Sequence, residues 1–468
     1  MSDSWATSGL DLHLDLTGSR VRAALENALR EAVRSGRLAA DTRLPSSRTL
    51  AADLGIARNT VAEAYSQLVG EGWLVAAQGS GTRVAGQVSA ARPAASLAAA
   101  EVSRFRYDLR PGSPDLSSFP RTEWLAAARR ALLGAPAEAF GYTDPRGRPE
   151  LRAALAGYLA RARGVRIVPE RIVICSGFTQ GLGLLCQVLR ARGATTLAAE
   201  AYGLAGNRST AAAAGLRLQT LPVDDQGARI QELTRADAVL VTPAHQFPLG
   251  PALAAARRIQ LIHWARDTAG LIIEDDYDGE FRYDRQPIGA LQSLAPEQVV
   301  YAGTASKTLA PGLRLGWLAV PAHLIDDIAA AKAAADRHTS TLDQLALAEF
   351  TSRGGYDRHI RRRRLAYRRR RDRLLTELHR HAPQLHVLGI AAGMHALLQL
   401  PEGHTEDETV TRAAQRGLAL EGLGAYRLTR QPHQPALVLG YATPPDHAFT
   451  GAIARLCAVL TDPRRPTG

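Results

Sequence analysis

The chain has 468 residues, of which 46% are hydrophobic and 22% charged, and its formal net charge is +12 at pH 7. A chain of this length exceeds one ordinary core, so we expect two or three domains. No apolar run approaches the ~20 residues that span a bilayer, and the start lacks the pattern of a secretion signal. Three cysteines without metal-ligand spacing fit a reducing compartment, so we expect a cytoplasmic protein with no membrane segment.

Residues 14–84 begin with a compact helical pattern. Apolar residues recur at every fourth position over residues 21–33, which is one face of a helix. Further on, LPSSRTLAADLG offers Ser46 or Ser47 as an N-cap and Gly55 as the residue that ends the helix. A second short helix follows in IARNTVAEAYSQLVGEGWL, and the tight turn between the two predicts a helix-turn-helix.

The end of this segment, GWLVAAQGSGTRV, predicts two short strands that form a wing. With the wing, the segment resembles the winged helix-turn-helix of the GntR family of bacterial regulators. The resemblance implies double-stranded DNA as a partner and four contact residues, Arg48, Arg58, Asn59 and Thr60. Gln78 and Gly79 of the wing are further candidates for DNA contact. A recognition helix presents its N-terminal residues to the major groove, where Arg pairs with guanine and Asn with adenine. The family often has Ser or Thr where Ala57 stands, so this helix cap is predicted to be weaker.

A change of pattern separates this segment from the rest of the chain. Residues 86–104 are rich in Ala and Ser and contain no aromatic residue, so we expect a linker over residues 85–105. From residue 106 to 462, helical patterns alternate with short apolar runs at 171–175, 238–242, 270–276 and 299–303. Apolar strands that alternate with helices predict an α/β domain with a mostly parallel sheet, in which ligands bind at the carboxyl ends of the strands.

Lysine is rare in this chain, and one of its two lysines, Lys307, follows the last of these predicted strands. An arginine cannot form a Schiff base, whereas a primary amine condenses with an aldehyde once its pKa is lowered. Pyridoxal phosphate is the aldehyde cofactor that needs such an amine, an acid for its pyridine nitrogen and a cradle for its phosphate. Lys307 offers the amine, Asp275 the acid and the turn at 176–179 the cradle. Three residues near the lysine can reach the same phosphate: Thr304, Ser306 and Arg314.

Five motifs between residues 107 and 460 resemble the fold type I aminotransferases: RPGSPDLSSFP, GYTDPRGRPELRAALAGYLARARGV, SGFTQGL, IIEDDYDGEF and GTASKTLAPGLRLGW. The resemblance implies a three-layer α/β/α fold with a small C-terminal α+β subdomain, and pyridoxal 5'-phosphate as the cofactor. It also implies that Lys307 forms the Schiff base, Asp275 pairs with the pyridine nitrogen and Tyr277 bonds the ring hydroxyl. Tyr202 would stack on the ring, although it also fits a core aromatic. The implied phosphate contacts are Gly177, Phe178, Thr179, Thr304, Ser306 and Arg314, and Ser176 begins the turn that forms the cradle.

Two positions depart from the aminotransferase pattern. His245 stands near the place of an Asn that touches the ring hydroxyl, and we keep it as a candidate site residue. Val438 stands in the place of the Arg that clamps the substrate carboxylate. Arg427 and Arg430 are candidates to replace that Arg. Either a small ligand is held differently here, or the cofactor itself is the signal.

A GntR-type domain, a linker and an aminotransferase-like domain together resemble the MocR regulators. That resemblance implies a cytoplasmic transcription factor that binds pyridoxal phosphate and forms a head-to-tail homodimer on repeated DNA half-sites. Its effector would be the cofactor itself or a small amino compound, such as γ-aminobutyrate or taurine, that reacts at Lys307. Two alternatives stay open: an active aminotransferase tethered to DNA, and an effector domain that serves only for dimerisation.

The positive charge is unevenly distributed. Residues 1–86 hold nine Arg and nine acidic residues, whereas residues 358–373 hold ten Arg and one Asp. This Arg-rich run fits either a solvated helix face or a patch that attracts phosphates.

Overall fold

A computed structural model describes residues 21–77, 81–86, 105–283, 288–389, 391–428 and 433–461. These residues fall into two compact units, residues 21–86 and residues 105–461, and each unit is described by itself. The predicted contact residues Gln78 and Gly79, and the candidate Arg430, lie outside the described residues.

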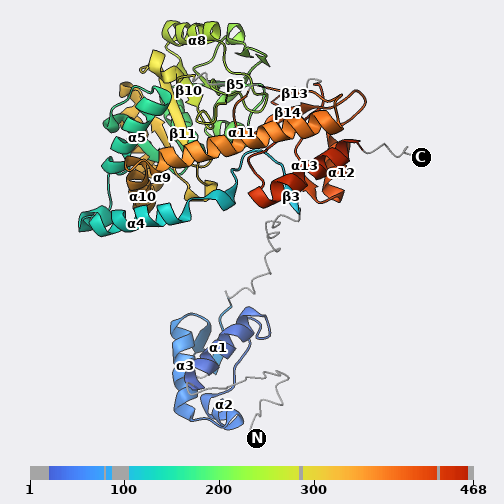
Figure 1. Cartoon of the computed structure of the whole chain (residues 1–468). Coiled ribbons are helices and arrows are strands. Elements are labelled where there is room, and N and C mark those ends of the chain that lie inside the picture. The colour runs from blue at the N-terminus through green and yellow to red at the C-terminus, as the bar shows by residue number, and fades with distance from the viewer. Residues whose placement is uncertain are drawn as a thin grey trace. The chain divides into compact units, whose positions relative to one another are not determined.

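The N-terminal unit, blue in Figure 1, consists of α1 (Val21–Arg34), α2 (Ser47–Leu54), α3 (Arg58–Gly70), β1 (Leu74–Ala77) and β2 (Gly81–Val84). The two strands pair antiparallel, with Leu74 opposite Val84. Leucines and valines of all three helices and both strands form one buried core, which holds Leu25, Leu29, Leu50, Val61, Leu68, Leu74 and Val84. The predicted helix-turn-helix and wing are confirmed.

The helix ends follow the sequence signals. The Ser46 hydroxyl accepts a hydrogen bond from the Thr49 N–H at 3.1 Å, and Gly55 ends α2 with a φ of +64°. Ala57 precedes α3 and provides no side-chain hydrogen bond. The backbone N–H groups at the start of α3 therefore have no side-chain acceptor at the cap position, although the Thr60 N–H donates to Ala57 O at 3.0 Å.

The C-terminal unit is built on a seven-stranded sheet in the order β4-β12-β11-β10-β9-β5-β6. These strands are β4 (Ile172–Cys175), β12 (Gly316–Ala319), β11 (Val299–Thr304), β10 (Leu271–Asp275), β9 (Ala238–Val241), β5 (Thr196–Glu200) and β6 (Arg217–Leu221). β12 runs antiparallel to both of its neighbours, and the remaining pairs are parallel. The four strands predicted from apolar runs are present, and the predicted mostly parallel sheet is confirmed.

Helices cover both faces of this sheet. One face packs against α6 (Phe178–Ala191), α7 (Ala205–Ala213) and α9 (Ile325–Asp336). The other face packs against α4 (Arg121–Gly134), α5 (Pro149–Arg163), α8 (Ala255–Thr268) and α10 (Thr341–Ser352). Alternation along β4 shows the division, since Val173 joins the first core and Ile172 and Ile174 join the second. The predicted three-layer α/β/α fold is confirmed.

A long helix, α11 (Gly355–His381), leads from the large sheet to a smaller subdomain, orange and red in Figure 1. This subdomain holds β13 (Val387–Leu388), β14 (Ala396–Gln399), β16 (Ala436–Leu439), α12 (Glu406–Gln415) and α13 (Asp446–Thr461). Its β15 (Leu418–Ala419) pairs with β3 (Tyr107–Asp108), and a separate hairpin joins β7 (Val223–Asp224) to β8 (Gly227–Ala228). The β3–β15 pairing anchors the segment that continues to Gly112 in the site.

The Arg-rich run forms part of α11, and its arginines have different surroundings. Arg370 is buried and pairs with Asp115 at 2.8 Å. Seven others are exposed: Arg358, Arg361, Arg362, Arg364, Arg368, Arg369 and Arg373. A solvated face therefore describes only part of the run, because a buried ion pair within it fixes the helix against the residues near 115.

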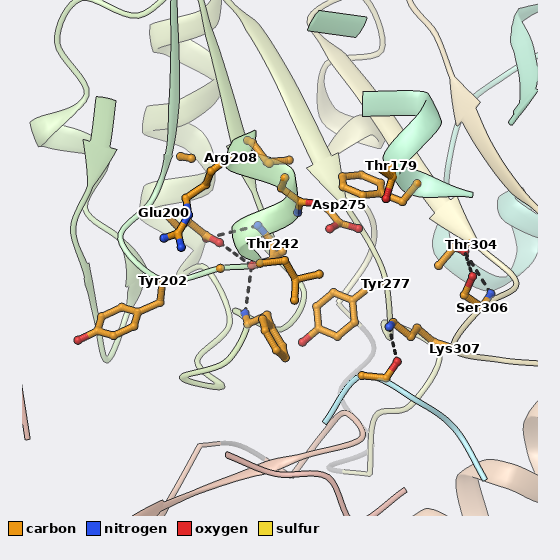
Figure 2. A pocket seen from close by; sticks show the side chains of 18 of the residues that line it. Thr179, Glu200, Tyr202, Arg208, Thr242, Asp275, Tyr277, Thr304, Ser306 and Lys307 are labelled. Atoms are coloured by element: carbon orange, nitrogen blue, oxygen red, sulfur yellow. Dashed lines mark hydrogen bonds between the residues drawn. The ribbon is translucent and has the colours of Figure 1, made fainter. Parts of the chain in front are cut away.

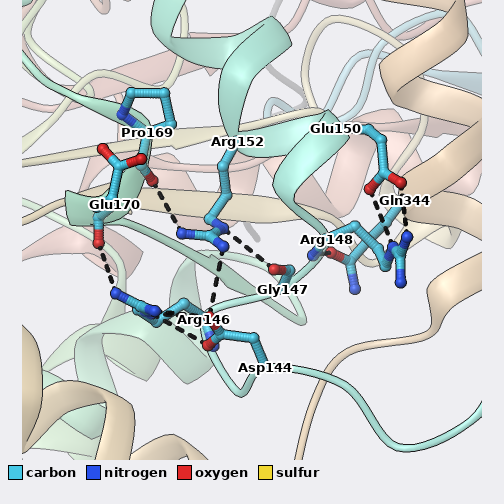
Figure 3. A network of polar contacts seen from close by, with 9 residues as sticks. All are labelled: Asp144, Arg146, Gly147, Arg148, Glu150, Arg152, Pro169, Glu170 and Gln344. Carbon is cyan, nitrogen blue, oxygen red and sulfur yellow. Dashed lines mark hydrogen bonds and ion pairs between the residues drawn. The ribbon is translucent and has the colours of Figure 1, made fainter. Parts of the chain in front are cut away.

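A polar network, shown in Figure 3, fixes the loop that precedes α5. Arg152 donates to Gly147 O at 3.1 Å and to Pro169 O at 3.2 Å, and Arg146 pairs with Asp144 at 2.7 Å. Gly147 has a φ of +97°, and a Cβ there would lie 2.6 Å from Gln344 Oε1. The GYTDPRG motif thus supports the fold by a tight turn beside β4.

Two expectations from composition can be compared with the described residues. The three cysteines are free and buried, and burial raises the pKa values of the Cys175 and Cys186 thiols to about 12. Among the described helices, none is long and apolar enough to cross a membrane.

Candidate functional site

A cavity of about 250 Å³ opens where strands of the large sheet end (Figure 2). Nine of the residues predicted from the sequence line it: Phe178, Thr179, Tyr202, Asp275, Tyr277, Thr304, Ser306, Lys307 and Arg314. Ser176, Gly177 and His245 are not among the lining residues, but each contacts one that is. The structure thus gathers the predicted cofactor residues, which lie far apart in sequence, around one space.

Lys307 follows β11 and reaches across the cavity to the segment after β3. Its Nζ donates to Gly112 O at 2.5 Å. Burial lowers the pKa of the Lys307 ammonium, while the carboxyls of Asp275 and Asp278 act in the opposite direction. A lowered pKa favours the neutral amine, which is the form that attacks an aldehyde.

Asp275 ends β10, the strand beside β11, and is 8% exposed. Burial raises the pKa of its carboxyl to about 8, with Lys307 opposing and Asp276, Asp278 and Glu200 contributing. A cationic group placed against this carboxyl would restore its charged form. Asp275 therefore fits the protonated ring nitrogen of a bound pyridine.

Behind the cavity, His245 connects Tyr277 to a second acid. Its Nδ1 lies 2.8 Å from Asp278 Oδ2 and 3.1 Å from the Tyr277 hydroxyl. His395, which lines the cavity from the small subdomain, lies beside His245, with ring centroids 5.0 Å apart and ring planes tilted by 38°. Its Nε2 lies 3.1 Å from Pro248 O. These contacts place His245 beside Tyr277, where it holds the Tyr277 hydroxyl in position.

The turn before α6 forms a cradle for an anion. Gly177 has a φ of +87°, and a Cβ there would lie 2.9 Å from Arg314 Nη2. Arg314 donates to Ser176 O at 2.5 Å, and Ser306 N–H donates to Thr304 Oγ1 at 3.1 Å. The start of α6, hydroxyls and one guanidinium therefore converge on one side of the cavity, an arrangement that suits a phosphate.

The second lysine of the chain supports this cradle from behind. Ser176 N–H donates to Gln180 Oε1 at 2.7 Å, and Gln180 Nε2 donates to Asp336 Oδ2 at 2.7 Å. Asp336 in turn pairs with Lys332, whose side chain is fully buried. A chain of polar contacts thus links α9 to the turn that holds the predicted phosphate contacts.

The position of the expected carboxylate-clamping Arg is apolar in the structure. Val438 is fully buried in β16, in a cluster with Phe247 and Tyr426. Arg427 donates to His433 Nδ1 at 2.9 Å and is not among the residues that line the cavity. Among the described residues, therefore, neither Val438 nor Arg427 places a guanidinium in the cavity.

Sequence reasoning missed several residues that line the same cavity: Gly112, Glu200, Arg208, Thr242, Phe247, Met394 and His395. Glu200 ends β5, and its carboxyl accepts from the Thr242 hydroxyl at 2.6 Å. Burial raises the pKa of Glu200 to about 7. The sequence could have indicated Glu200, because it is an acidic residue at the end of the apolar run TLAAE. No comparable pattern marks Arg208, which reaches the cavity from a helix.

In the N-terminal unit, the four predicted DNA contacts that the structure describes lie at or near the surface. Arg48 of α2 is exposed, as are Arg58 and Asn59 at the start of α3, and Thr60 is half-buried. Side chains in these places are available to the edges of bases in a major groove.

Two family descriptions match the sequence. Residues 22–84 match the bacterial regulatory proteins of the gntR family, and residues 109–435 match aminotransferase class I and II. The matches coincide with the helix-turn-helix unit and with the unit that holds the cavity.

Several characterised or named proteins are similar along nearly their whole length. The probable rhizopine catabolism regulatory protein MocR of Rhizobium meliloti is 34% identical over 445 residues, covering 89% of both chains. The pyridoxine biosynthesis transcriptional regulator PdxR of Corynebacterium glutamicum is 32% identical over 407 residues, covering 86% of this chain and 88% of that protein. The regulator TauR of Rhodobacter capsulatus is 30% identical, covering 93% of this chain and 96% of that protein.

Solved structures are similar to the C-terminal unit. An archaeal alanine:glyoxylate aminotransferase has a TM-score of 0.68 at 26% identity, covering 76% of this chain and 90% of that one. LysN, an α-aminoadipate aminotransferase of Thermus thermophilus in complex with N-(5'-phosphopyridoxyl)-L-leucine, also has a TM-score of 0.68 at 26% identity, with coverage of 76% and 92%. These similarities and the fit of the residues around the cavity identify pyridoxal phosphate as the cofactor.

Proposed function

We propose that Lys307 is the sensing residue of this chain, which belongs to the MocR-type transcriptional regulators. In these regulators, a gntR-family DNA-binding domain is joined to an aminotransferase-like domain that binds pyridoxal phosphate. The signal is the cofactor itself or a small amino compound that reacts where Lys307 holds the cofactor. We assign residues 14–84 to DNA binding, 85–105 to a linker and 106–462 to the effector domain.

The observation that carries this proposal is the pairing of Lys307 and Asp275 across one cavity. Asp275 ends β10 and Lys307 follows the neighbouring parallel strand β11, and burial moves both pKa values toward the neutral forms. When bound, pyridoxal phosphate supplies an aldehyde for an amine and a ring nitrogen that attracts a carboxylate. Lys307 would hold the aldehyde end, Asp275 the ring nitrogen, and Tyr277, positioned by His245, the ring hydroxyl.

The remaining cofactor contacts follow from the cradle. Phosphate oxygens would accept from Ser306, Thr304 and Arg314, and from backbone N–H groups of the turn over residues 176–179. Tyr202 would cover one face of the ring.

Exposed apolar side chains on one segment of the C-terminal unit support a homodimer. Leu125 is 70% exposed and Leu133 77% exposed on α4, and Tyr142 that follows is 83% exposed. Exposed large apolar side chains along one segment favour an interface. We propose that this segment meets a second copy, head to tail, and that the pair binds repeated half-sites. Light scattering should show a dimer, and Leu133→Glu should shift it toward monomer.

Signal transmission requires only a modest energy. If cofactor or amine binding changes the arrangement of the effector domains, a differential affinity of ~1–3 kcal/mol for operator DNA gives a response of about 5- to 150-fold. The linker would carry that change to the spacing of the two DNA-binding domains.

The direct test is reduction of the purified protein with borohydride in the presence of pyridoxal phosphate. We expect a visible absorbance band before reduction and a covalent adduct on the peptide that contains Lys307. Lys332 is the only other lysine of the chain and serves as an internal control. A colourless protein, or an adduct on Lys332, would contradict the proposal.

The alternative of an active aminotransferase has its support in the cofactor residues, all of which are present. The buried Val438, in place of a carboxylate clamp, speaks against it. Multiple turnover with any amino donor, measured by formation of the oxo acid, would favour the enzyme. A single partial conversion of bound cofactor would leave the regulator as the function.

A further inference from the structure

The cavity extends beyond the residues assigned to the cofactor. Four apolar side chains line it from β5, β6 and β9: Leu197, Ala199, Leu218 and Leu240. The register pairs Leu197 with Leu218 and Ala199 with Leu240, so all four share one face of the sheet. We call this space, with Asn207 and Arg208 of α7, the inner lobe.

The inner lobe runs along the sheet and away from the strand ends. Leu197 lies three residues before the end of β5, which places it roughly 10 Å below that end. The face that these residues occupy is the one packed against α6 and α7. The cofactor contacts Asp275 and Lys307 lie instead at and beyond strand ends, so the lobe is space that the ring does not need.

Arg208 provides the charge of the inner lobe. Its Nη1 is buried and has no hydrogen-bond partner among the described residues. Burial lowers the pKa of its guanidinium, and no acidic side chain among the described residues opposes that shift. A buried N–H without an acceptor is unfavourable, and a guanidinium is suited to a carboxylate. Arg208 therefore calls for an anionic partner.

Three other charged groups of the cavity have hydrogen-bond partners of their own. Lys307 donates to Gly112 O, and Arg314 donates to Ser176 O. The Glu200 carboxyl accepts from Thr242 and from Gln246 Nε2 at 3.2 Å. Figure 2 shows Arg208 and Glu200 on the side of Asp275 away from Lys307. Arg208 is thus placed for a ligand other than one held at the lysine.

We infer that the inner lobe is a second ligand site, which binds a short aliphatic carboxylate. The carboxylate accepts hydrogen bonds from Arg208, and the alkyl chain packs against Leu197, Leu218 and Leu240. One guanidinium and apolar walls match a monoanion with a hydrocarbon tail, whereas a phosphate needs more donors. The inference goes beyond the proposed function, because this ligand neither reacts with Lys307 nor displaces the cofactor.

Calorimetric titration of the full-length protein, loaded with pyridoxal phosphate, tests the site with butyrate as the probe. We expect one butyrate per chain, and binding weaker by at least roughly tenfold for butanol and butylamine, which lack the carboxylate. Butyrate should bind without removing the visible absorbance band of the bound cofactor, so this result is distinct from the sensing role of Lys307. Absence of butyrate binding, or competition between butyrate and pyridoxal phosphate, would overturn the inference.

Two substitutions locate the ligand. Arg208→Gln should weaken butyrate binding by roughly ten- to a hundredfold, while Arg190→Gln, on α6, should not change it. Leu218→Ala enlarges the lobe, so the affinity for hexanoate relative to butyrate should rise. The visible band of the bound cofactor reports that each variant is folded. Equal butyrate affinity in Arg208→Gln, or an unchanged ratio in Leu218→Ala, would place the carboxylate elsewhere.

Discussion

The two units of the chain place their functional side chains in opposite surroundings. In the N-terminal unit, Arg48, Arg58 and Asn59 are exposed, and the buried residues of the helices only pack. In the C-terminal unit, Asp275 is 8% exposed and burial lowers the pKa of Lys307. Base recognition needs side chains that extend from the surface, whereas amine chemistry needs a site that disfavours the charged amine. Substitutions of functional residues should therefore change function without changing stability in the N-terminal unit. In the C-terminal unit they should change both.

The largest separation is expected for Arg58→Ala combined with Asn59→Ala. Each bidentate base contact contributes about 1–3 kcal/mol, so affinity for the operator should fall by roughly a hundredfold or more. Because both side chains are exposed, the melting temperature and the cofactor band should not change. Fluorescence anisotropy at one salt concentration measures the affinity.

Arg22→Ala, on α1 of the same unit, is the matched control, since it removes an exposed ion pair with Glu63 and no predicted base contact. Equal loss of DNA affinity in the control would show that general charge, and not base recognition, accounts for the effect.

In the C-terminal unit, Asp275→Asn should weaken cofactor binding by at least roughly tenfold and yet stabilise the cofactor-free protein above neutral pH. The Asp275 carboxyl has a pKa of about 8 in the folded protein, against an ordinary value of 3.8. The protonated Asp275 carboxyl therefore makes its full contribution to the free energy of unfolding below about pH 4, and this contribution is lost as the pH rises to about 8.

Removing this titration should raise the free energy of unfolding at pH 8 by on the order of 1–3 kcal/mol, and change it little at pH 4. Urea unfolding of cofactor-free protein at several pH values checks this. Some dependence of the free energy of unfolding on pH should remain in the Asn variant, because burial also raises the pKa values of Glu200 and Glu274 to about 7. An unaltered pH slope in the Asn variant would contradict the assigned environment of Asp275.

A smaller effect tests the support of the phosphate cradle. Asp336→Asn weakens the contact of Gln180 and leaves the ammonium of the buried Lys332 without a charged partner. We expect pyridoxal phosphate to bind roughly tenfold more weakly, while pyridoxal, which lacks the phosphate, binds as before. Asp327→Asn, at the exposed start of α9, is the control. Equal losses for both compounds would mean that Asp336 acts on the fold as a whole.

The smallest expected effect concerns the exposed arginines of α11. If they attract DNA without regard to sequence, Arg361→Glu with Arg369→Glu should flatten the dependence of log affinity on log salt by about one per lost phosphate contact. Arg266→Glu, exposed on α8, serves as the control. An unchanged slope would mean that these arginines only solvate the helix.

The sequence predicted those parts of the site that follow local rules. Asp275 and Lys307 were found because each follows an apolar run, and carboxyl ends of parallel strands meet at one edge. The inner lobe was not predicted, because the neighbours of Leu197 and Leu218 depend on the strand order β9-β5-β6 and on the packing of α7. β12 was missed because nothing local marks an antiparallel strand between two others. His395 reaches the cavity only through the tertiary placement of the small subdomain.

The most direct measurement compares operator affinity with and without pyridoxal phosphate for the unaltered protein and for Lys307→Ala. The fragment upstream of its own gene is the first operator to use, and candidate amines can be added in the same titration. We predict that the cofactor changes the affinity of the unaltered protein by at least about fivefold and that of Lys307→Ala not at all. An equal change in both proteins, or no change in either, would contradict sensing through Lys307.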